Sequence, residues 1–477
     1  VKHFALYGAS ESGRDYNTVD MSRLRMYNEY LAPYKAAVDA GVGSVMSSFN
    51  IIDGIPATAN KWLLTDLLRD EWSFGGLLVT DYNSIAEMAS HGIAPLKEAS
   101  VRALKAGTDM DMVSCGFLNT LEESLKEGKI MEDQINTACR RVLEAKYKLG
   151  LFSNPYKYGD TLRVKEQLYT AEHRSAARAI ASETFVLLKN ENHLLPLGLK
   201  GKIALVGPMA DARNNMCGMW SMACTASRHG TLLEGIRSAA GDKAEILYAK
   251  GSNVYEDAEM EKAAAGIRPL EHEDNRKLLD EALRVASRAD VIVAALGECA
   301  EMSGESASRT NLEIPDAQQN LLKALLKTGK PVVLLLFTGR PLVLNWEDAN
   351  VHSILNVWFG GSETGDAVAD VLFGKVTPSG KLTTTFPRSV GQLPLFYNHL
   401  NTGRPDPDNR VFNRYASNYL DESNEPLYPF GFGLSYTDFV YGDLQISSET
   451  LPKNGELTAS VTVTNKGNYD GYETVQL

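Results

Sequence analysis

The sequence predicts an α/β protein: the C-terminal half of a (β/α)8 barrel, then a doubly wound α/β sandwich, then the start of a β-sandwich. Three observations predict this fold class. Short apolar runs alternate with helical patterns up to about residue 150, longer apolar runs do so again from residue 203, and a pattern of period two marks the C-terminal region. The expected parts are the barrel at 1–152, a linker at 153–175, the sandwich at 176–395, connecting loops at 396–435 and the β domain at 436–477.

The barrel part contains four strand candidates: HFALY at 3–7, GSVMSSF at 43–49, GLLVT at 76–80 and DMDMV at 109–113. Helices are expected at 23–40, 60–72 and 131–149, and Gly150 ends the last of them. Four βα units are half of an eight-unit barrel, a fold of about 250 residues. We therefore expect a fragment of a longer protein, with the earlier strands elsewhere.

The sandwich part begins with a helix expected at about 175–188, after a polar linker. Its strand candidates are IALVGP at 203–208, EILYAK at 245–250, DVIVAALG at 290–297, PVVLLLF at 331–337 and SILNVW at 353–358. Because these runs are apolar almost throughout, helices should cover both faces of the sheet.

The C-terminal region changes character. The stretches PSGKLTTTFP and YPFGFGLSY, with the Pro- and Asn-rich segment between them, should form ordered loops on the sandwich. In ELTASVTVTNKG, apolar residues alternate with Thr and Ser, which indicates a half-exposed antiparallel strand. This strand would begin a β-sandwich of immunoglobulin-like type.

Composition excludes some classes of function. The net charge of −12 and the pI near 5.3 argue against a nucleic-acid partner and against an anionic membrane surface. No apolar run reaches the roughly 20 residues that span a bilayer, and the first residues show no signal-peptide pattern. The five cysteines are too few and odd in number for a disulfide framework, so we expect buried free thiols, with a Cys217–Cys224 bridge as the alternative.

Common catalytic motifs are absent. The sequence has no Walker loop, no G-x-G-x-x-G and no H-E-x-x-H, which removes the best support for nucleotide-binding and zinc-protease functions. GGSETG at 360–365 lacks the final Gly of a nucleophile elbow.

Asp81 follows the strand candidate GLLVT directly. Barrel enzymes place catalytic groups at the C-terminal ends of strands, where the loops converge. The alternative is that Asp81 caps a helix starting near Asn83 or Ser84. Asp109 and Asp111 compete for the catalytic role, although their alternation could place one of them inside the barrel as a structural group.

A second group of carboxylates lies in the loop ECAEMSGESASRTNLEIP, after the strand candidate at 290–297. Glu298, Glu301 and Glu305 would lie at the carboxyl edge of the second sheet, where open α/β sheets bind ligands. The alternative is an exposed surface turn.

Together, these residues resemble glycoside hydrolase family 3, in particular its bacterial periplasmic-type β-glucosidase branch. The resemblance extends in the family's order over nearly the whole chain, through KHFALYGASESGRDYNTVDMS, YLAPYKAAVDAGVGSVMSSFNIIDGIPATAN, LLRDEWSFGGLLVTDYNSI, LLKNENHLLPL, GESASRTNLEIP, GKPVVLLLFTGRP, GKLTTTFPRSVGQLP and YPFGFGLSYTDF. It implies a barrel, an α/β sandwich and a fibronectin-type-III-like domain.

The resemblance also implies retaining hydrolysis through a covalent glycosyl-enzyme. Asp81 matches the nucleophile in the family's [ST]-D-[WYH] signature, and Glu305 matches the acid/base in S-G-E. Retention requires the two carboxyl groups to lie about 5 to 5.5 Å apart, so the resemblance implies a site shared by two domains.

The implied sugar-binding residues are Lys2 and His3, which match a K-H pair that holds hydroxyls, and Met46 and Tyr82, which match positions lining the glycone subsite. An Asp and an Arg that complete this subsite in the family would lie upstream of this sequence. The mechanism requires no metal or organic cofactor. The resemblance implies a periplasmic or secreted protein and leaves a homodimer open.

The predicted function is an exo-acting β-glucosidase that releases glucose from non-reducing ends. A β-xylosidase or arabinosidase of the same family is an alternative, because one hydroxymethyl group changes pocket affinity by only a few kcal/mol. An N-acetylglucosaminidase is disfavoured, since its D-x-H loop has no counterpart in GASESGRDYNTVD. A non-catalytic carbohydrate-binding protein is the alternative from another class.

Overall fold

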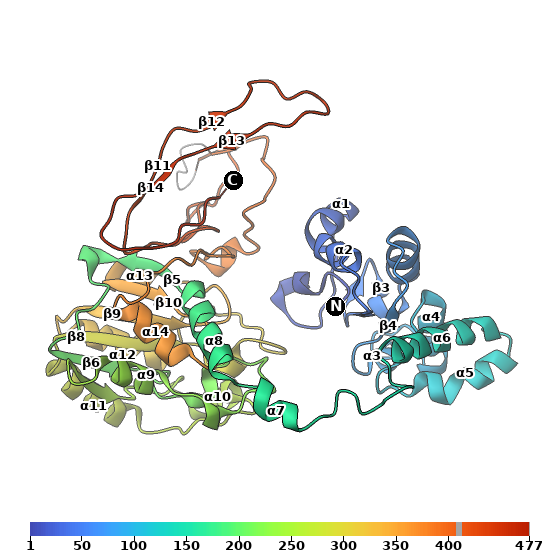
Figure 1. Cartoon of the computed structure of the whole chain (residues 1–477), viewed down its shortest axis with the longest axis horizontal. Coiled ribbons are helices and arrows are strands. Elements are labelled where there is room, and N and C mark those ends of the chain that lie inside the picture. The colour runs from blue at the N-terminus through green and yellow to red at the C-terminus, as the bar shows by residue number, and fades with distance from the viewer. Residues whose placement is uncertain (407–412, 477) are drawn as a thin grey trace. The chain divides into compact units, whose positions relative to one another are not determined.

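The computed structural model describes residues 1–406 and 413–476 and divides into two compact units, Val1–Leu168 and Tyr169–Leu477 (Figure 1). Each unit buries apolar clusters of its own. Part of the loops expected at 396–435 and the last residue of the β domain expected at 436–477 lie outside the described residues. Among the helices that are described, none is both long and apolar enough to cross a membrane.

The first unit contains parallel strands. β1 (Ser44–Met46) pairs in parallel with β4 (Leu77–Val79). Phe4 forms a parallel bridge to the residue after β1, and Met110 forms one to the last residue of β4. The four predicted strand segments therefore lie side by side in chain order. This confirms the predicted parallel pairing, although the outer two segments form single bridges instead of full strands.

The helices of this unit follow the predicted apolar patterns. The helix expected at 23–40 is divided into three pieces, and those expected at 60–72 and 131–149 are present as single elements. The elements are η1 (Tyr7–Ala9), η2 (Glu11–Gly13), α1 (Arg23–Arg25), η3 (Met26–Tyr30), α2 (Ala32–Asp39), η4 (Ala57–Ala59), η5 (Trp62–Glu71), α3 (Ser84–Glu87), α4 (Leu96–Ala106), α5 (Gly116–Lys126), α6 (Glu132–Lys148) and α7 (Leu162–Gln167), with a hairpin of β2 (Ile51–Ile52) and β3 (Ile55–Pro56).

The helix predicted at 175–188 is wrong at both ends. α8 (Ala171–Thr184) begins earlier, because the Thr170 hydroxyl accepts a hydrogen bond from the backbone N–H of His173 at 3.2 Å and caps the helix. The chain then enters β5 (Val186–Asn190). The first three residues of β5 are fully buried, and a short apolar run of this kind looks the same in a buried strand and in a buried helix.

The second unit is built on a six-stranded sheet with the order β5-β10-β9-β8-β6-β7 (Figure 1). The five predicted strands are confirmed and pair in parallel, whereas β5 pairs antiparallel with β10 at the edge. The predicted strands are β6 (Lys202–Val206), β7 (Glu245–Ala249), β8 (Val291–Gly297), β9 (Val332–Phe337) and β10 (Ser353–Asn356).

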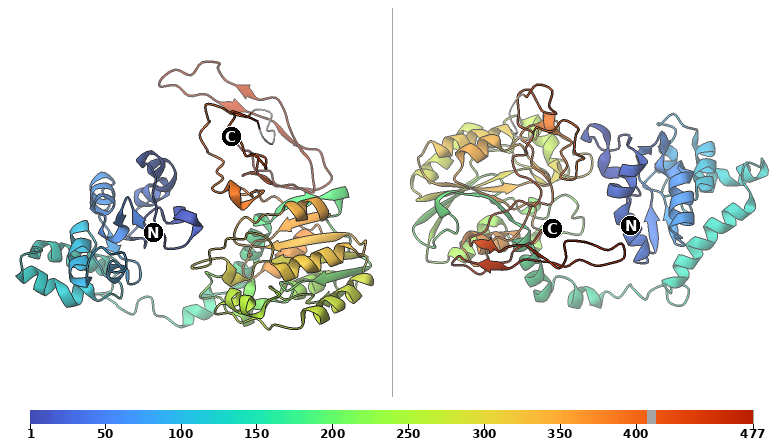
Figure 2. Two further views of the ribbon diagram at one scale, coloured as in Figure 1. Left: turned by 180° about the vertical axis from the view of Figure 1, so that it is seen from behind. Right: turned by 90° about the horizontal axis from the view of Figure 1, so that it is seen from above.

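Helices cover both faces of this sheet (Figure 2). Alternate residues of each strand enter two different apolar clusters; in β9, Val333 and Leu335 belong to one cluster while Val332 and Leu334 belong to the other. The first cluster is completed by α8, α9 (Leu232–Ala240), α10 (Ala258–Ala265) and α14 (Thr364–Leu372), and the second by α11 (Asn275–Ser287), α12 (Asp316–Leu326) and α13 (Asn345–Asn350). The doubly wound arrangement is therefore confirmed.

The segments after α14 return to this sheet, as predicted. Phe386 and Tyr428 form a bridge and are buried in the second cluster, and Leu434 bridges to β5. The predicted antiparallel pairing at the C-terminus is confirmed in two short ladders. β11 (Phe439–Tyr441) pairs with β14 (Val463–Asn465), and β12 (Gln445–Ile446) pairs with β13 (Ala459–Ser460).

The prediction of buried free thiols is wrong for all cysteines except Cys299. Cys217 and Cys224 form a disulfide, while Cys115 and Cys139 are free and exposed. In the same loop, Arg268 donates hydrogen bonds to the carbonyl oxygens of residues 218 and 219.

Candidate active site

Asp81 lies at the C-terminal end of β4 and is fixed by its backbone neighbours. The hydroxyl of Thr80 donates to the Asp81 carbonyl oxygen at 2.8 Å and accepts from the N–H of Met112 at 2.9 Å. One carboxylate oxygen, Oδ1, accepts a hydrogen bond from the N–H of Tyr82 at 2.7 Å. The side chain caps no helix, because α3 has Asn83 at its N-cap and receives no side-chain bond there. The capping alternative is therefore wrong.

The other oxygen of Asp81, Oδ2, is buried and receives no hydrogen bond from any group that the structure describes. It lies 3.3 Å from Nε2 of His3 in an ion-pair contact. A buried carboxylate oxygen normally accepts hydrogen bonds, and leaving one without them costs free energy. An oxygen kept in this state at the end of a strand is available to a ligand.

The residues predicted to bind sugar lie on neighbouring strands of the first unit. The N–H of Met46 donates to the carbonyl oxygen of Val1 at 3.0 Å, and the N–H of Phe4 donates to Met46 at 2.8 Å, so Lys2 and His3 lie beside β1. Met46 in turn pairs with Val79 at the end of β4. One edge of three adjacent segments therefore carries Lys2, His3, Met46 and the Asp81–Tyr82 pair. The Tyr82 residue is 60% exposed.

Asp109 and Asp111 each have structural partners, although Oδ1 of Asp111 is also buried without a hydrogen bond from the described residues. The Asp109 carboxylate binds Arg69 at 2.6 Å and Arg141 at 2.9 Å, and it accepts from the N–H of Leu78 at 2.9 Å. Asp111 accepts from the first two N–H groups of α5, at 2.7 and 3.2 Å. The prediction that one of these residues is structural is confirmed for Asp109.

Glu87 is a carboxylate near Asp81 that the sequence pattern did not single out. Burial and, to a lesser extent, the negative charge of Asp81 raise the pKa of Glu87, while His91 lowers it. Glu87 is the last residue of the one-turn helix α3 and lies six residues after Asp81. The only signal in the sequence was its place in the first turn of the helix after the candidate nucleophile.

In the loop after β8, Glu298 is completely buried and neutralised. Its Oε1 lies 2.7 Å from Arg309 and 3.1 Å from Arg340, and its Oε2 accepts from the hydroxyl of Thr338 at 3.0 Å. Glu301 pairs with Arg268 at 3.0 Å. These two carboxylates therefore hold the loop in place, and the alternative of an exposed surface turn is wrong for this part of it.

Glu305 lies in the segment of this loop between Met302 and Ala307, and Arg340 binds the backbone at both ends of that segment. Arg340 donates to the carbonyl oxygens of Met302 at 2.5 Å and of Ala307 at 2.8 Å. Between these anchors, Gly304 has φ +154°, and a Cβ there would lie 2.1 Å from the sulfur of Met219. The segment therefore needs Gly before Glu305, whose side chain is partly exposed.

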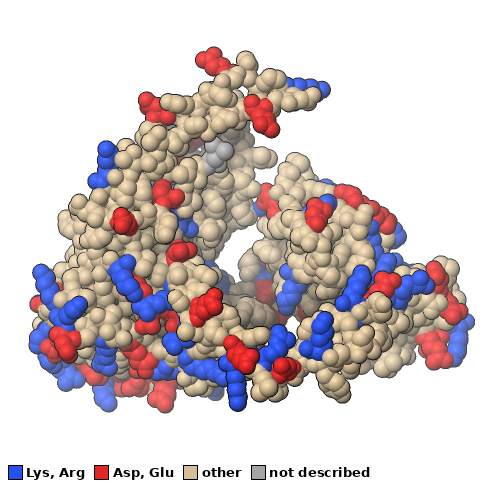
Figure 3. Space-filling view, viewed as in Figure 1, with Lys and Arg blue, Asp and Glu red and all other residues tan. Residues whose placement is uncertain are grey.

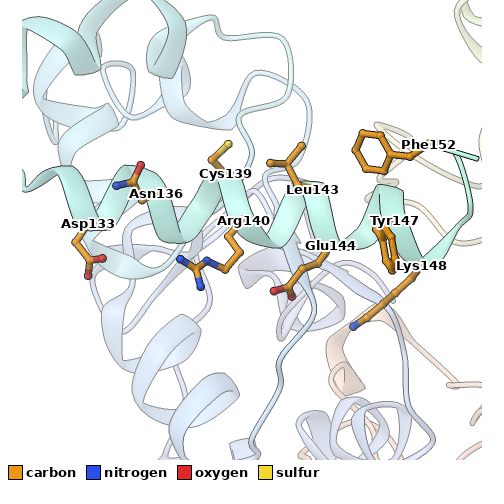
Figure 4. Close-up of a pocket in the computed structure, with 9 residues that line it drawn as sticks. All are labelled: Asp133, Asn136, Cys139, Arg140, Leu143, Glu144, Tyr147, Lys148 and Phe152. Carbon is orange, nitrogen blue, oxygen red and sulfur yellow. The ribbon is translucent and has the colours of Figure 1, made fainter.

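A cavity of about 660 Å³ opens along α6 in the first unit (Figure 4). Its lining side chains come from successive turns of this one helix and from Phe152, and Figure 4 shows them spread along the helix instead of converging. None of the predicted site residues lines it. On the face drawn in Figure 3, acidic and basic side chains are interspersed.

Comparison with known proteins identifies the family. The profile of the glycosyl hydrolase family 3 N terminal domain matches residues 1–145, and that of the C-terminal domain matches residues 185–436. The periplasmic beta-glucosidase of Salmonella typhimurium is 48% identical over 100% of this chain and 63% of its own length. A beta-xylosidase of Formosa agariphila is 37% identical over 100% of this chain and 64% of its own length.

Solved structures agree with these relatives. The beta-glucosidase from Listeria innocua in complex with isofagomine superimposes with a TM-score of 0.87 at 41% identity, covering 99% of this chain and 63% of that one. The chain thus spans less than two thirds of the length of the proteins it matches. It belongs to glycosyl hydrolase family 3.

Proposed function

We propose that the protein is a retaining, exo-acting β-glucosidase that hydrolyses terminal non-reducing β-D-glucosyl residues, with Asp81 as nucleophile and Glu305 as general acid/base. The observation that carries the proposal is the buried Oδ2 of Asp81, free of hydrogen bonds at the end of a parallel strand. Relatives named as beta-glucosidases, and a Listeria beta-glucosidase solved with glucose, support the substrate class.

The chemistry proceeds in two steps. Asp81 Oδ2 attacks the anomeric carbon while the glycosidic bond breaks, and its electron pair stays on the leaving oxygen, which takes the proton of Glu305. In the second step the Glu305 carboxylate removes a proton from water. That water attacks the same carbon and releases Asp81. The proposal requires the two carboxyl groups to lie about 5 to 5.5 Å apart on the bound sugar.

The remaining residues bind the terminal sugar. Lys2 and His3 donate hydrogen bonds to hydroxyl groups, and the His3 ring, 3.3 Å from Asp81, also orients the nucleophile. The exposed ring of Tyr82 stacks on one sugar face, and Met46 supplies an apolar contact. No group in this scheme needs a metal or organic cofactor.

The proposal extends to fold and location. The first unit is the C-terminal half of a (β/α)8 barrel, supported by its four parallel segments in chain order. Residues 436–477 begin a fibronectin-III-like domain, supported by the two antiparallel ladders. The name of the Salmonella relative supports a periplasmic location.

A β-xylosidase is the second candidate, because the Formosa relative at 37% identity carries that name. Assays of the full-length protein with p-nitrophenyl β-glucoside, β-xyloside and N-acetyl-β-glucosaminide distinguish the candidates. We expect the highest kcat/KM for the glucoside, with β-glucose as the first product seen by NMR. A preference for the xyloside would change the substrate, and turnover of none of the three would favour a non-catalytic binding protein.

A further inference from the structure

A second cluster of reactive side chains lies in the second unit, in the loop between β6 and α9. Cys217 and Cys224 are joined there by a disulfide. Nε2 of His229 lies 3.7 Å from the sulfur of Cys217 and 3.5 Å from that of Cys224. The three potential ligand atoms lie within 4.8 Å of one another. None of the proposed catalytic residues takes part in this cluster.

The imidazole of His229 is buried, with 5% of the residue exposed, and its orientation is fixed. Nδ1 lies 3.2 Å from the carbonyl oxygen of Gly230, so Nδ1–H donates there and the lone pair of Nε2 faces the sulfurs. The carbonyl oxygen of His229 accepts from Arg213, which also pairs with Glu234. Histidines that bind metals commonly have this arrangement, with the second ring nitrogen donating to a carbonyl.

The distances fit a tetrahedral ion. Zn²⁺ binds thiolate sulfur at about 2.3 Å and imidazole nitrogen at about 2.0–2.1 Å, and a tetrahedral angle between such bonds places the nitrogen about 3.6 Å from each sulfur. The distances from His229 Nε2, 3.5 and 3.7 Å, agree with this value. The two sulfurs would lie about 3.8 Å apart on such an ion, which is a normal separation for sulfurs that are not bonded to each other.

The cluster opens into a cavity of about 230 Å³, whose lining includes all three ligand residues together with Ser221 and Arg268. This space can hold a water molecule as a fourth ligand. The positive charge of Arg268 is balanced, because its guanidinium pairs with Glu301 and donates to the carbonyl oxygens of residues 214, 218 and 219. Two thiolates and a neutral imidazole balance a divalent cation.

We propose that Cys217, Cys224 and His229 form a redox-gated Zn²⁺ site. A dithiol reductant converts the disulfide to two thiols and is itself oxidised to a disulfide. Binding of Zn²⁺ then displaces the two thiol protons, and both thiolates and His229 Nε2 coordinate the ion. Because the sulfurs bond either to each other or to the metal, oxidation releases Zn²⁺. Soft thiolate ligands favour Zn²⁺ over Mg²⁺ and Ca²⁺.

Zinc titration of the full-length protein tests this proposal, in a Cys115→Ser/Cys139→Ser background that removes the exposed free thiols. After reduction with a phosphine, competition against a chromophoric chelator should show one Zn²⁺ per chain, with no such site in the oxidised protein. His229→Gln should weaken binding by more than the roughly 10- to 100-fold that loss of an outer-shell partner causes. His193→Gln, which changes an exposed histidine of the same unit, should leave the affinity unchanged.

Co²⁺ provides a test without variants of the cluster. The reduced protein should show thiolate-to-Co²⁺ charge transfer and the visible bands of tetrahedral Co²⁺, and both should disappear on oxidation. The proposal is overturned if the reduced protein binds neither metal, if the oxidised protein binds Zn²⁺ equally well, or if His229→Gln binds Zn²⁺ as tightly as the parent.

Discussion

Asp81 lies two residues after the end of β4 and Glu298 lies directly after β8, but the two carboxylates differ in their partners. Asp81, after β4, keeps one oxygen without a hydrogen bond, whereas Glu298, after β8, is surrounded by two arginines and the Thr338 hydroxyl. Position at a strand end is therefore not enough to assign catalysis. Two arginines and a hydroxyl reach the Glu298 carboxylate and mark it as structural, whereas no such donors reach Oδ2 of Asp81.

The second difference concerns distance from the strand. The carboxylate that we propose as acid/base, Glu305, lies beyond two structural glutamates in the same loop. The nucleophile must approach one carbon atom from a fixed direction, which favours the rigid end of a strand. The acid/base must serve both the leaving group and water, and a loop anchored at both ends by Arg340 can hold it.

Asp81→Ala should cause the largest loss of activity. If activity were unchanged, the contrast between a catalytic Asp81 and a structural Glu298 would be wrong. Removing the proposed nucleophile should prevent a glycosyl-enzyme from forming, so kcat/KM on p-nitrophenyl β-glucoside should fall by more than the roughly 10²–10⁴-fold typical of an acid/base group. Asp111→Ala is the matched control, since that carboxylate binds the start of α5. Equal losses for both variants would contradict the assignment.

Glu305→Ala should lower activity in a way that depends on the leaving group. We expect a loss of roughly 10²–10⁴-fold with alkyl glucosides, which need protonation, and a much smaller loss with 2,4-dinitrophenyl glucoside. Azide should restore turnover and yield a β-glucosyl azide. Glu301→Gln serves as the control, because its effect should not vary with the leaving group; a uniform loss in Glu305→Ala would count against its role.

Glu298→Gln tests the structural role of Glu298 by its effect on the free energy of unfolding. The substitution leaves Arg309 and Arg340 without their buried counter-charge, which should lower the free energy of unfolding by about 3 kcal/mol in urea denaturation. Asp66→Asn, which breaks an exposed pair with Lys61, should cost at most about 1 kcal/mol. A Glu298 variant as stable as the parent would show that burial there does not depend on the arginines.

Glu347 shows what burial does to a carboxylate that has an amide donor, Gln319, instead of arginines. Burial raises the pKa of Glu347 to about 7, from an ordinary value of 4.5. The folded state therefore holds this proton more tightly than the unfolded state, and its contribution to stability is lost as pH rises from about 4.5 to 7. Glu347→Gln should gain stability relative to the parent between pH 5 and pH 8, by up to a few kcal/mol in urea unfolding. A difference that does not change with pH would contradict the raised pKa.

The parts of the fold that the sequence predicts are those with local signals. The five apolar runs of the second unit became strands because both faces of that sheet are covered. β5 was missed because its apolar run continues the helix before it without a Gly or Pro between them. The position of Asp81 after a strand was predictable because the apolar run GLLVT directly precedes it in the sequence.

The hydrogen-bond and ion-pair partners of each carboxylate could not be predicted, because they lie far away in the sequence. Asp109 binds Arg69, 40 residues away, and Arg141, 32 residues away. No local pattern distinguishes such a pair from a free acid. The Cys217–Cys224 bridge was only the alternative, because the sequence alone does not show that the two sulfurs come together.

The most direct test of the central claim is to trap the covalent intermediate on Asp81. Incubating the full-length protein with 2,4-dinitrophenyl 2-deoxy-2-fluoro-β-glucoside, followed by peptide mass spectrometry, should show one fluoroglucosyl group on the peptide containing Asp81 and none in Asp81→Ala. A label on another carboxylate, or turnover without any covalent adduct, would contradict Asp81 as the nucleophile.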